Sequence, residues 1–274
     1  MTQTDLPSSL VLIGAGKMGG AMLQGWLALG LAPSAVSVID PFASQELTDL
    51  CSRKGVTLNP ALASLAAPQV LVLAVKPQML DQAAPDIAPL VGPGTLVVSI
   101  MAGKTMGDIA ARLPASAIVR AMPNTPAAVG RGVTGVAASS GVTSVQRAMA
   151  DALLRAIGRV EWVGDETLID AVTAVSGSGP AYVFHMVEAL AAAGEKIGLP
   201  AEIAMRLARA TVEGSGELMY REPDVSAAQL RKNVTSPGGT TAAALDVLMA
   251  PDGLGDLMGR AVAAAKRRAG ELSG

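Results

Sequence analysis

Three glycines near the start of the chain have the spacing that a bound dinucleotide requires. Gly14, Gly16 and Gly19 follow four apolar residues, 10–13, and stand at the head of a helical pattern. In this arrangement the first glycine permits a tight turn, the second lets the backbone approach a pyrophosphate, and the third lets helix and strand pack closely. The helix N-terminus also offers unpaired N–H groups to a phosphate. The stretch predicts a dinucleotide site, with a ligand-free strand-to-helix turn as the alternative.

An acidic residue ends the second apolar run. Asp40 follows residues 36–39, where an acidic side chain typically accepts hydrogen bonds from the adenosine ribose. Its charge would also repel a 2′-phosphate, which favours NADH. Because a proline follows, Asp40 could equally be an ordinary turn residue. Ser44, Arg53 and Lys54 are close enough in sequence to hold a phosphate instead, so the choice between NADH and NADPH stays open.

A lysine and a proline follow the buried run at residues 70–75. In open α/β sheets, ligands bind outside the carboxyl ends of the strands. Lys76 could therefore face a phosphate or the nicotinamide ribose, and Pro77 would stiffen the turn. A solvated loop lysine is the plainer alternative.

Two later loops combine glycines, hydroxyl groups and the start of a helix. Residues 236–241 read Ser-Pro-Gly-Gly-Thr-Thr and precede an apolar helical run. Exposed amides at such a helix start suit a small carboxylate, whereas a threonine-capped turn between helices is the alternative interpretation. Residues 176–180, Ser-Gly-Ser-Gly-Pro, open the longest helix and have similar chemistry.

Strand and helix patterns alternate through the first half of the chain. We expect strands at residues 10–13, 36–39, 56–58, 70–75, 95–100, 117–122, 132–138 and 159–163. With helices between them, this pattern predicts an α/β Rossmann-type, doubly wound parallel sheet. Beyond residue 164 only helical periodicity remains, which predicts an all-helical C-terminal domain. The predicted domains are residues 1–165, which bind the dinucleotide, and residues 166–274, which bind substrate and dimerise.

Composition excludes several classes of function. The 274 residues carry a net charge of −2 with scattered basic residues, which argues against nucleic acid or an anionic membrane as partner. Cys51 and His185 are the single cysteine and histidine, so a disulfide framework, a zinc site and a Ser-His-Asp triad are difficult to build.

Residues 1–5 lack the basic region of a signal peptide, and no stretch has the length and apolarity of a membrane span. We therefore expect a cytoplasmic protein.

Six stretches along the chain also match a known family in the right order. They are residues 13–19, 73–78, 99–103, 120–126, 176–182 and 230–241. Together they resemble pyrroline-5-carboxylate reductase, the enzyme that completes proline biosynthesis. The last block is the most specific, because it distinguishes this family from other Rossmann dehydrogenases. The resemblance covers nearly the whole chain.

This resemblance implies an oxidoreductase that uses NADPH or NADH to reduce 1-pyrroline-5-carboxylate, a cyclic imine, to L-proline. It implies catalytic roles for Thr241, which would hydrogen-bond the ring nitrogen, and for Ser176 beside the nicotinamide. The substrate would be bound by Gly238, Gly239, Thr240, Thr241 and Asp224. The cofactor would be bound by Gly14, Gly16, Lys17, Met18, Gly19, Asp40, Asn59, Ala74, Val75, Lys76, Pro77, Met101, Ala102, Gly103, Met122 and Pro123. A homodimer through the helical domain is implied, and larger rings of dimers occur in the family.

The implied chemistry also explains why an obvious catalytic base is missing. Oxidising an alcohol requires a base that accepts the hydroxyl proton, whereas a protonated imine already has an electrophilic carbon. A resemblance to 6-phosphogluconate dehydrogenase would demand a lysine on the long helix after residue 179, where Ala181, Tyr182 and Val183 stand. A cofactor-binding sensor without turnover is a further alternative, but a sensor has no need for the stretch at 236–241. Many family members carry a pattern suited to a 2′-phosphate where this chain has Asp40, so the resemblance does not decide the cofactor.

Overall fold

The computed structural model describes residues 6–273, which form two compact units. The first comprises Met1–Ser178 together with Ala265–Gly274, and the second comprises Gly179–Ala264. This division keeps residues 166–178 with the sheet, whereas the domain prediction places its boundary at 165/166. Residues 1–5, considered above for a signal peptide, lie outside the described part of the chain.

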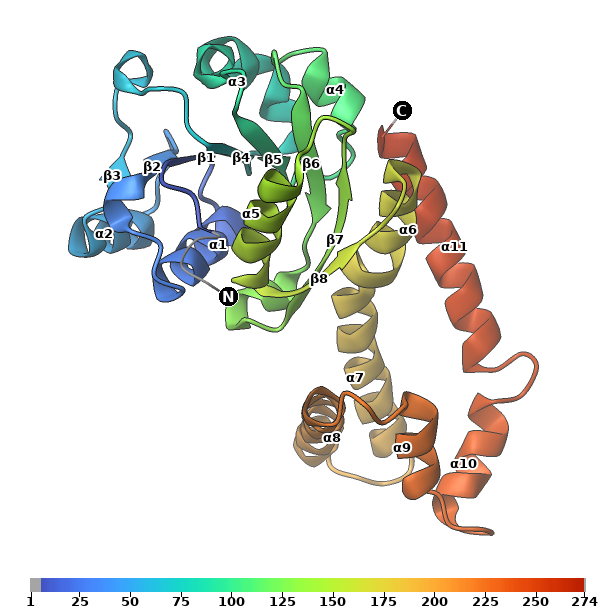
Figure 1. Ribbon diagram of the computed structural model, residues 1–274. Coiled ribbons are helices and arrows are strands. Elements are labelled where there is room, and N and C mark those ends of the chain that lie inside the picture. The colour runs from blue at the N-terminus through green and yellow to red at the C-terminus, as the bar shows by residue number, and fades with distance from the viewer. Residues whose placement is uncertain (1–5, 274) are drawn as a thin grey trace. The chain divides into compact units, whose positions relative to one another are not determined.

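An eight-stranded sheet in the order β3-β2-β1-β4-β5-β6-β7-β8 forms the centre of the first unit (Figure 1). The strands are β1 (Leu10–Ile13), β2 (Val36–Ile39), β3 (Thr57–Leu58), β4 (Val70–Leu73), β5 (Leu96–Ser99), β6 (Ala117–Met122), β7 (Gly132–Ala138) and β8 (Gly158–Trp162). The order reverses direction at β1, which creates the switch point where dinucleotides bind in such sheets. The predicted Rossmann-type sheet and helical C-terminal part are confirmed.

One pairing departs from the predicted parallel sheet. β6 and β7 run antiparallel, with Met122 opposite Gly135, while the other paired strands are parallel. The segment between them contains only the short 3₁₀ turn Thr125–Val129. A parallel pair needs a crossover of a dozen or more residues, so this connection allows only the antiparallel arrangement.

Helices cover both faces of the sheet. On one face lie α1 (Lys17–Ala28), α2 (Gln45–Lys54) and α5 (Ser144–Arg155), whose buried side chains pack against Leu10 and Leu12 of β1. On the other lie α3 (Leu80–Ile87) and α4 (Met106–Ala110), which pack against Val11 and Ile13. Because successive strand residues point to opposite faces, an uninterrupted apolar run supplies both cores.

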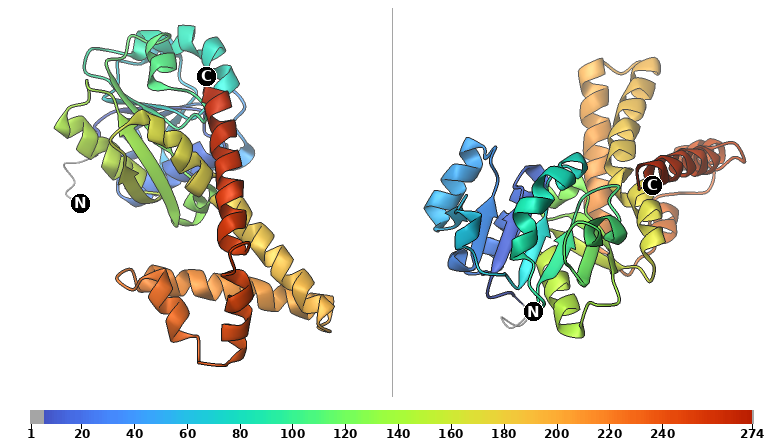
Figure 2. Two further views of the ribbon diagram at one scale, coloured as in Figure 1. Left: turned by 90° about the vertical axis from the view of Figure 1, so that its right-hand side faces the viewer. Right: turned by 90° about the horizontal axis from the view of Figure 1, so that it is seen from above.

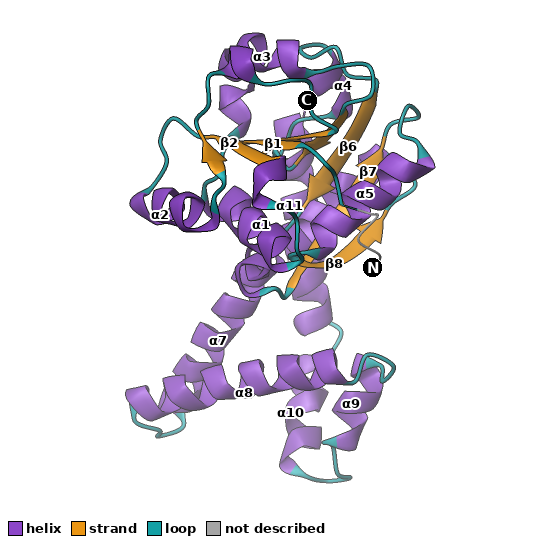
Figure 3. Ribbon diagram, turned by 60° about the vertical axis from the view of Figure 1, so that its left-hand side comes forward, coloured by secondary structure: helices purple, strands orange, loops and turns teal. Residues whose placement is uncertain are grey.

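After β8 the chain continues only as helices among the described residues (Figure 3). The first unit holds α6 (Ile169–Val172), a π-helical turn at Thr173–Gly177 and the end of α11 (Leu254–Ser273). The second unit contains α7 (Gly179–Lys196), α8 (Ala201–Arg221), α9 (Ala227–Asn233), α10 (Thr240–Leu248) and the start of α11.

Within the second unit, α7 and α8 lie side by side (Figure 2). Small residues make the close approach possible: a Cβ built at Gly194 would lie 3.2 Å from the Cβ of Ala204. Ala191, Ala204 and Ala208 are buried in this unit. Large apolar side chains stay exposed on the same helices, including Phe184 of α7 at 63% and Leu207 of α8 at 53%.

Candidate functional site

The glycine-rich turn leaves β1 in a conformation that only glycine adopts easily. Gly14 has φ +84°, and its N–H donates to the carbonyl of Ile39 at 2.8 Å. A Cβ built at Gly14 would lie 2.9 Å from the backbone carbon and oxygen of Ala74. Both the backbone angle and the neighbouring strand end therefore require glycine at this position.

The next two glycines of the motif have different surroundings. Gly16 is the N-cap of α1, no side chain caps the helix there, and a Cβ built at Gly16 meets nothing within 4 Å. At Gly19 a Cβ would lie 2.4 Å from the carbonyl oxygen of Gly14, so this glycine lets α1 pack on the turn. The space above Gly16 is open at the positive end of the helix, as the approach of a phosphate requires.

A cleft of about 770 Å³ opens beside this turn. Its lining includes Gly16, Lys17 and Asp40 among the predicted cofactor residues, and Ser44 from the alternative phosphate set. It also includes Ala15, Gly20, Ala21, Gln24, Gly25, Ala28, Phe42, Glu46, Leu47, Leu50, Ala127, Ala128, Gly130 and Ala156, which were not predicted as binding residues. Arg53 and Lys54 line an adjoining depression of about 360 Å³, which shares Gln24, Ala28, Glu46 and Leu50 with the cleft.

Asp40 is bound to the glycine-rich turn itself. Its Oδ2 accepts the N–H of Ala15 at 2.8 Å, and its Oδ1 accepts the N–H of Phe42 at 2.9 Å. The amide of Asn59 pairs with the Asp40 backbone, donating from Nδ2 to the carbonyl at 2.9 Å and accepting the N–H at 2.8 Å. The carboxylate thus lies beside the first turn of α1. Asn59 holds Asp40 in place and does not itself line the cleft.

The other predicted cofactor residues of the first unit follow the carboxyl ends of neighbouring strands. Ala74, Val75, Lys76 and Pro77 come after β4, and the N–H of Ala74 donates to the carbonyl of Ile13 at 2.8 Å. Met101, Ala102 and Gly103 come after β5, where the N–H of Met101 donates to the Ser99 hydroxyl at 3.3 Å. Met122 ends β6 and Pro123 follows it. Parallel neighbouring strands bring these three segments to one edge of the sheet.

Ser176 lies in the π-helical turn that follows α6. Its hydroxyl donates to the carbonyl of Val172 at 3.0 Å, and its own carbonyl accepts from Nδ2 of Asn124 at 3.0 Å. Oδ1 of Asn124 accepts the N–H of Val133 at 2.9 Å, so this buried amide joins the turn to β7. Single-turn π-helical insertions are frequent at functional sites. Asn124 was not predicted as a site residue, although it stands in the quoted stretch 120–126.

The predicted carboxylate site lies in the second unit. Gly239 is the N-cap of α10, and no side chain caps that helix, so Thr240 and Thr241 do not act as caps. Gly238 has φ +69° with open space where a Cβ would stand. The N–H of Gly239 donates to the carbonyl of Ser236 at 3.1 Å, whereas the amides of the first turn of α10 have no side-chain cap and suit an anion. Asp224 is exposed in the loop between α8 and α9.

Other chemistries find no support among the described residues. No group of His, Cys, Asp and Glu in residues 6–273 could hold a metal ion. His185 is exposed and its Nδ1 lies 3.0 Å from Oε2 of Glu188. Burial raises the pKa of the Cys51 thiol, which disfavours the reactive thiolate. In the part of the chain that the structure describes, no helix is both long enough and apolar enough to span a membrane.

Comparisons with known proteins identify the family. Residues 166–272 match the family model described as pyrroline-5-carboxylate reductase dimerisation, and residues 9–103 match that described as NADP oxidoreductase coenzyme F420-dependent. The chain is 39% identical to the pyrroline-5-carboxylate reductase of Pseudomonas aeruginosa, covering 96% of each protein. It is 44% identical to that of Synechocystis sp., covering 96% of this chain and 97% of the relative. The chain belongs to the pyrroline-5-carboxylate reductase family.

Solved pyrroline-5-carboxylate reductases have the same fold. That of Coxiella burnetii is 37% identical with a TM-score of 0.90, covering 97% of this chain and 99% of the other. The Plasmodium falciparum enzyme, solved with NADP bound, is 28% identical with a TM-score of 0.78, covering 97% and 98%. The family recognised from six sequence stretches is thereby confirmed, while the individual residue assignments remain predictions.

Proposed function

We propose that this chain reduces 1-pyrroline-5-carboxylate to L-proline with NADPH or NADH, as an oxidoreductase acting on a carbon–nitrogen bond. One observation carries this proposal: the chain matches pyrroline-5-carboxylate reductases over 96% of its length. The helix start after Gly239, which no side chain caps, agrees with it, because the substrate bears a small carboxylate.

The first unit fits a dinucleotide on structural grounds. The turn from Gly14 to Gly19 would hold the pyrophosphate, since Gly16 leaves its helix start uncovered. Asp40 would accept hydrogen bonds from the adenosine ribose at the cleft. Lys17 and Met18 would flank the phosphates, and Asn59 and residues 74–77 would border the riboses. The nicotinamide would lie near residues 101–103, Met122 and Pro123.

Substrate recognition would fall to the second unit. The amides around Gly238, Gly239 and Thr240 would bind the carboxylate, and Thr241 would hydrogen-bond the ring nitrogen. Asp224 would lie near the substrate, and Ser176 would complete the nicotinamide pocket. When bound, the reduced nicotinamide supplies the hydride. The protein's part is to orient the ring and to hold the nitrogen proton at Thr241, so no general base is required.

The chain would act as a homodimer formed through the helical residues 166–274. Residues 1–165 would form the dinucleotide-binding domain. Exposed apolar side chains on α7 and α8, such as Phe184 and Leu207, support the homodimer because monomeric proteins rarely leave such patches uncovered. We also propose that dimers assemble into rings and that the enzyme works in the cytoplasm.

The deciding experiment is spectrophotometric. The chain is mixed with 1-pyrroline-5-carboxylate and NADPH or NADH in turn, and the loss of nicotinamide absorbance is followed. A loss that depends on the imine supports the proposal. No loss with either cofactor, from a folded protein that still binds the dinucleotide, would favour the sensor alternative.

A further inference from the structure

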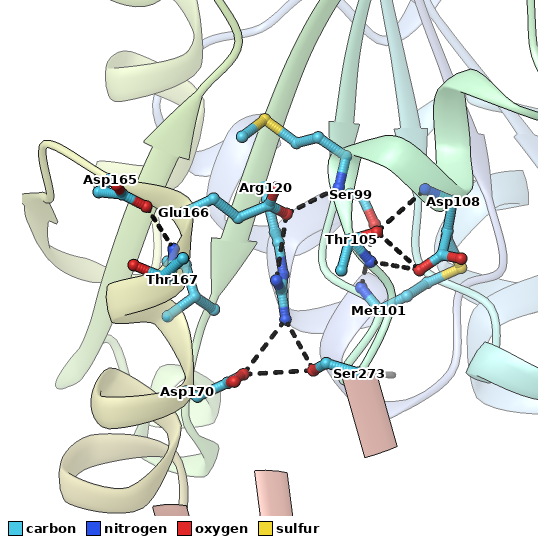
Figure 4. A network of polar contacts seen from close by, with 12 residues as sticks. Ser99, Met101, Thr105, Asp108, Arg120, Asp165, Glu166, Thr167, Asp170 and Ser273 are labelled. Atoms are coloured by element: carbon cyan, nitrogen blue, oxygen red, sulfur yellow. Dashed lines mark hydrogen bonds and ion pairs between the residues drawn. The ribbon is translucent and has the colours of Figure 1, made fainter. Parts of the chain in front are cut away.

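A buried arginine lies on the strand that leads to the proposed nicotinamide site. Arg120 is on β6, its side chain is only 5% exposed, and Figure 4 shows its guanidinium between residues of α6 and α11. Nη1 donates to Oε1 of Glu166 at 3.1 Å. Nη2 lies 3.7 Å from Oδ1 of Asp170 and 3.5 Å from the Ser273 hydroxyl. Two carboxylates thus surround a guanidinium that has little access to water.

The same network reaches the start of α4. Oε1 of Glu166 also accepts the N–H of Met106 at 2.7 Å, and Met106 stands shortly after the loop that contains Gly103. The end of α11 contacts that loop as well: a Cβ built at Gly103 would lie 2.8 Å from the carbonyl oxygen of Leu272. Arg120 therefore connects four segments of the first unit, namely β6, the loop before α4, the start of α6 and the last turn of α11.

At the end of β6 and just after it, two more residues contact the segment that begins at Glu166. Side chains two positions apart on a strand share a face, so Met122 lies on the face of Arg120. The Cε of Met122 would lie 3.1 Å from a Cβ built at Gly177, and Asn124 donates to the carbonyl of Ser176. Arg120, Met122 and Asn124 thus contact this segment from its first turn to the π-helical turn.

We propose that Arg120 is a positioning residue for the imine reduction. Its guanidinium holds residues 101–103, Met122 and Ser176 in register, and these are the three walls proposed for the nicotinamide. This inference rests on the proposed function, which places the nicotinamide there. Buried ion pairs are often no more stabilising than apolar residues of the same size, so fixed geometry is the better explanation for these charges. A displacement of about 1 Å at a reacting centre can lower the rate about 100-fold.

The test needs a variant that removes the network without leaving a charge unpaired. Arg120→Met alone leaves the carboxylates of Glu166 and Asp170 without their guanidinium partner and is expected to lower Tm. The triple variant R120M/E166Q/D170N removes all three charges, and the amide introduced by Glu166→Gln retains an oxygen for the Met106 N–H. Arg155→Met is the matched control, because Arg155 is half-exposed and its partner Asp151 lies on the same helix. Each protein is assayed for kcat, for Kd of NADPH and NADH, and for amide hydrogen exchange.

For the triple variant we expect kcat to fall at least about tenfold while Kd stays within about threefold. Amide exchange is expected to rise at residues 101–106 and 166–177, whereas the Arg155→Met control behaves like the parent. Parent-like kcat and exchange in the triple variant would overturn the proposal. If the triple variant does not fold, Arg120→Lys decides: a lower kcat at unchanged Tm supports the role, and an unchanged kcat refutes it.

The exchange measurement also separates the two proposals. If the unsubstituted chain binds the dinucleotide but does not reduce the imine, the proposed function fails. Whether Arg120 orders these segments is then still judged by whether exchange at residues 101–106 and 166–177 rises in the triple variant.

Discussion

The chain has two glycine-rich loops at helix starts, and the structure builds them in opposite ways. At residues 14–19, Gly14 and Gly19 are enclosed by backbone atoms of their own unit. At residues 236–241, Gly238 has an equally unusual φ, +69° against +84°, but a Cβ there would meet nothing within 4 Å. At Gly239 a Cβ would lie 2.5 Å from the Ser236 hydroxyl, which belongs to the same loop. The first loop is therefore fixed by packing against another strand end, whereas the second is fixed by contacts within itself. Similar sequence patterns thus describe one loop that is enclosed by a neighbouring strand end and one loop that is not.

Gly14→Ala is expected to have the largest effect. It adds a strained backbone angle and a close contact with Ala74. We therefore expect the free energy of unfolding to fall by about 3 kcal/mol and dinucleotide binding to be lost. The measurement is Tm by calorimetry, together with binding of NADPH and NADH. Gly16→Ala is the matched control, because its Cβ has open space: Tm should be unchanged while affinity falls about tenfold. Equal Tm values for the two variants would contradict the comparison.

Thr241→Ala tests the chemistry proposed for the second loop. Removing the hydroxyl that would hold the proton of the reacting nitrogen should lower kcat/KM about 100-fold. Tm should stay near that of the parent, since this side chain does not cap α10. Steady-state kinetics with saturating cofactor give the answer. Thr57→Ala, at an exposed position on β3, is the control, and a Thr241→Ala value within about twofold of the parent would exclude the role.

Asp40→Ser sharpens the interpretation of the first loop. Removing the negative charge from the cleft should raise kcat/KM for NADPH relative to NADH about tenfold, because a 2′-phosphate is no longer repelled. The ratio is the useful quantity, since losing the bond to the Ala15 N–H weakens the binding of both cofactors. An unchanged ratio would mean that Asp40 serves the turn alone.

Gly238→Ala should have the smallest effect. The substitution adds only the cost of a left-handed backbone, about 1 kcal/mol, because no neighbouring atom obstructs the new methyl group. Chemical denaturation measures this cost beside Gly14→Ala. A loss as large as that of Gly14→Ala would show that the second loop is packed as tightly as the first.

The sequence predicted what depends on local patterns. The apolar runs at 10–13 and 70–75 indicated buried strands, and the spacing of Gly14, Gly16 and Gly19 indicated the turn between β1 and α1. The antiparallel β6–β7 pair was missed, although the short connection at residues 125–129 carries the signal. The prediction treated the alternation of strands and helices as uniform along the chain.

Long-range polar contacts could not be predicted in the same way. Arg120 stands in an apolar strand pattern, and its partners Glu166, Asp170 and Ser273 are distant in sequence and lie on helices with ordinary composition. No sequence pattern marks the π-helical turn at Thr173–Gly177. The contacts that accompany it, between Val172 and Gly135 and from Asn124 to Ser176, form only in the folded chain. Residue types indicate where helices and strands end, but the partners of a long-range polar contact depend on tertiary packing.

The division of the chain has a consequence for its synthesis. The first unit is discontinuous: Ala265–Gly274 complete it only after Gly179–Ala264 have been made. On the ribosome, the sheet can therefore form early. The contact of Gly103 with Leu272 and that of Arg120 with Ser273 form only later. Until then a charged guanidinium lacks one of its partners and part of the first unit remains uncovered. The first unit therefore gains these contacts only after the last turn of α11 has been synthesised.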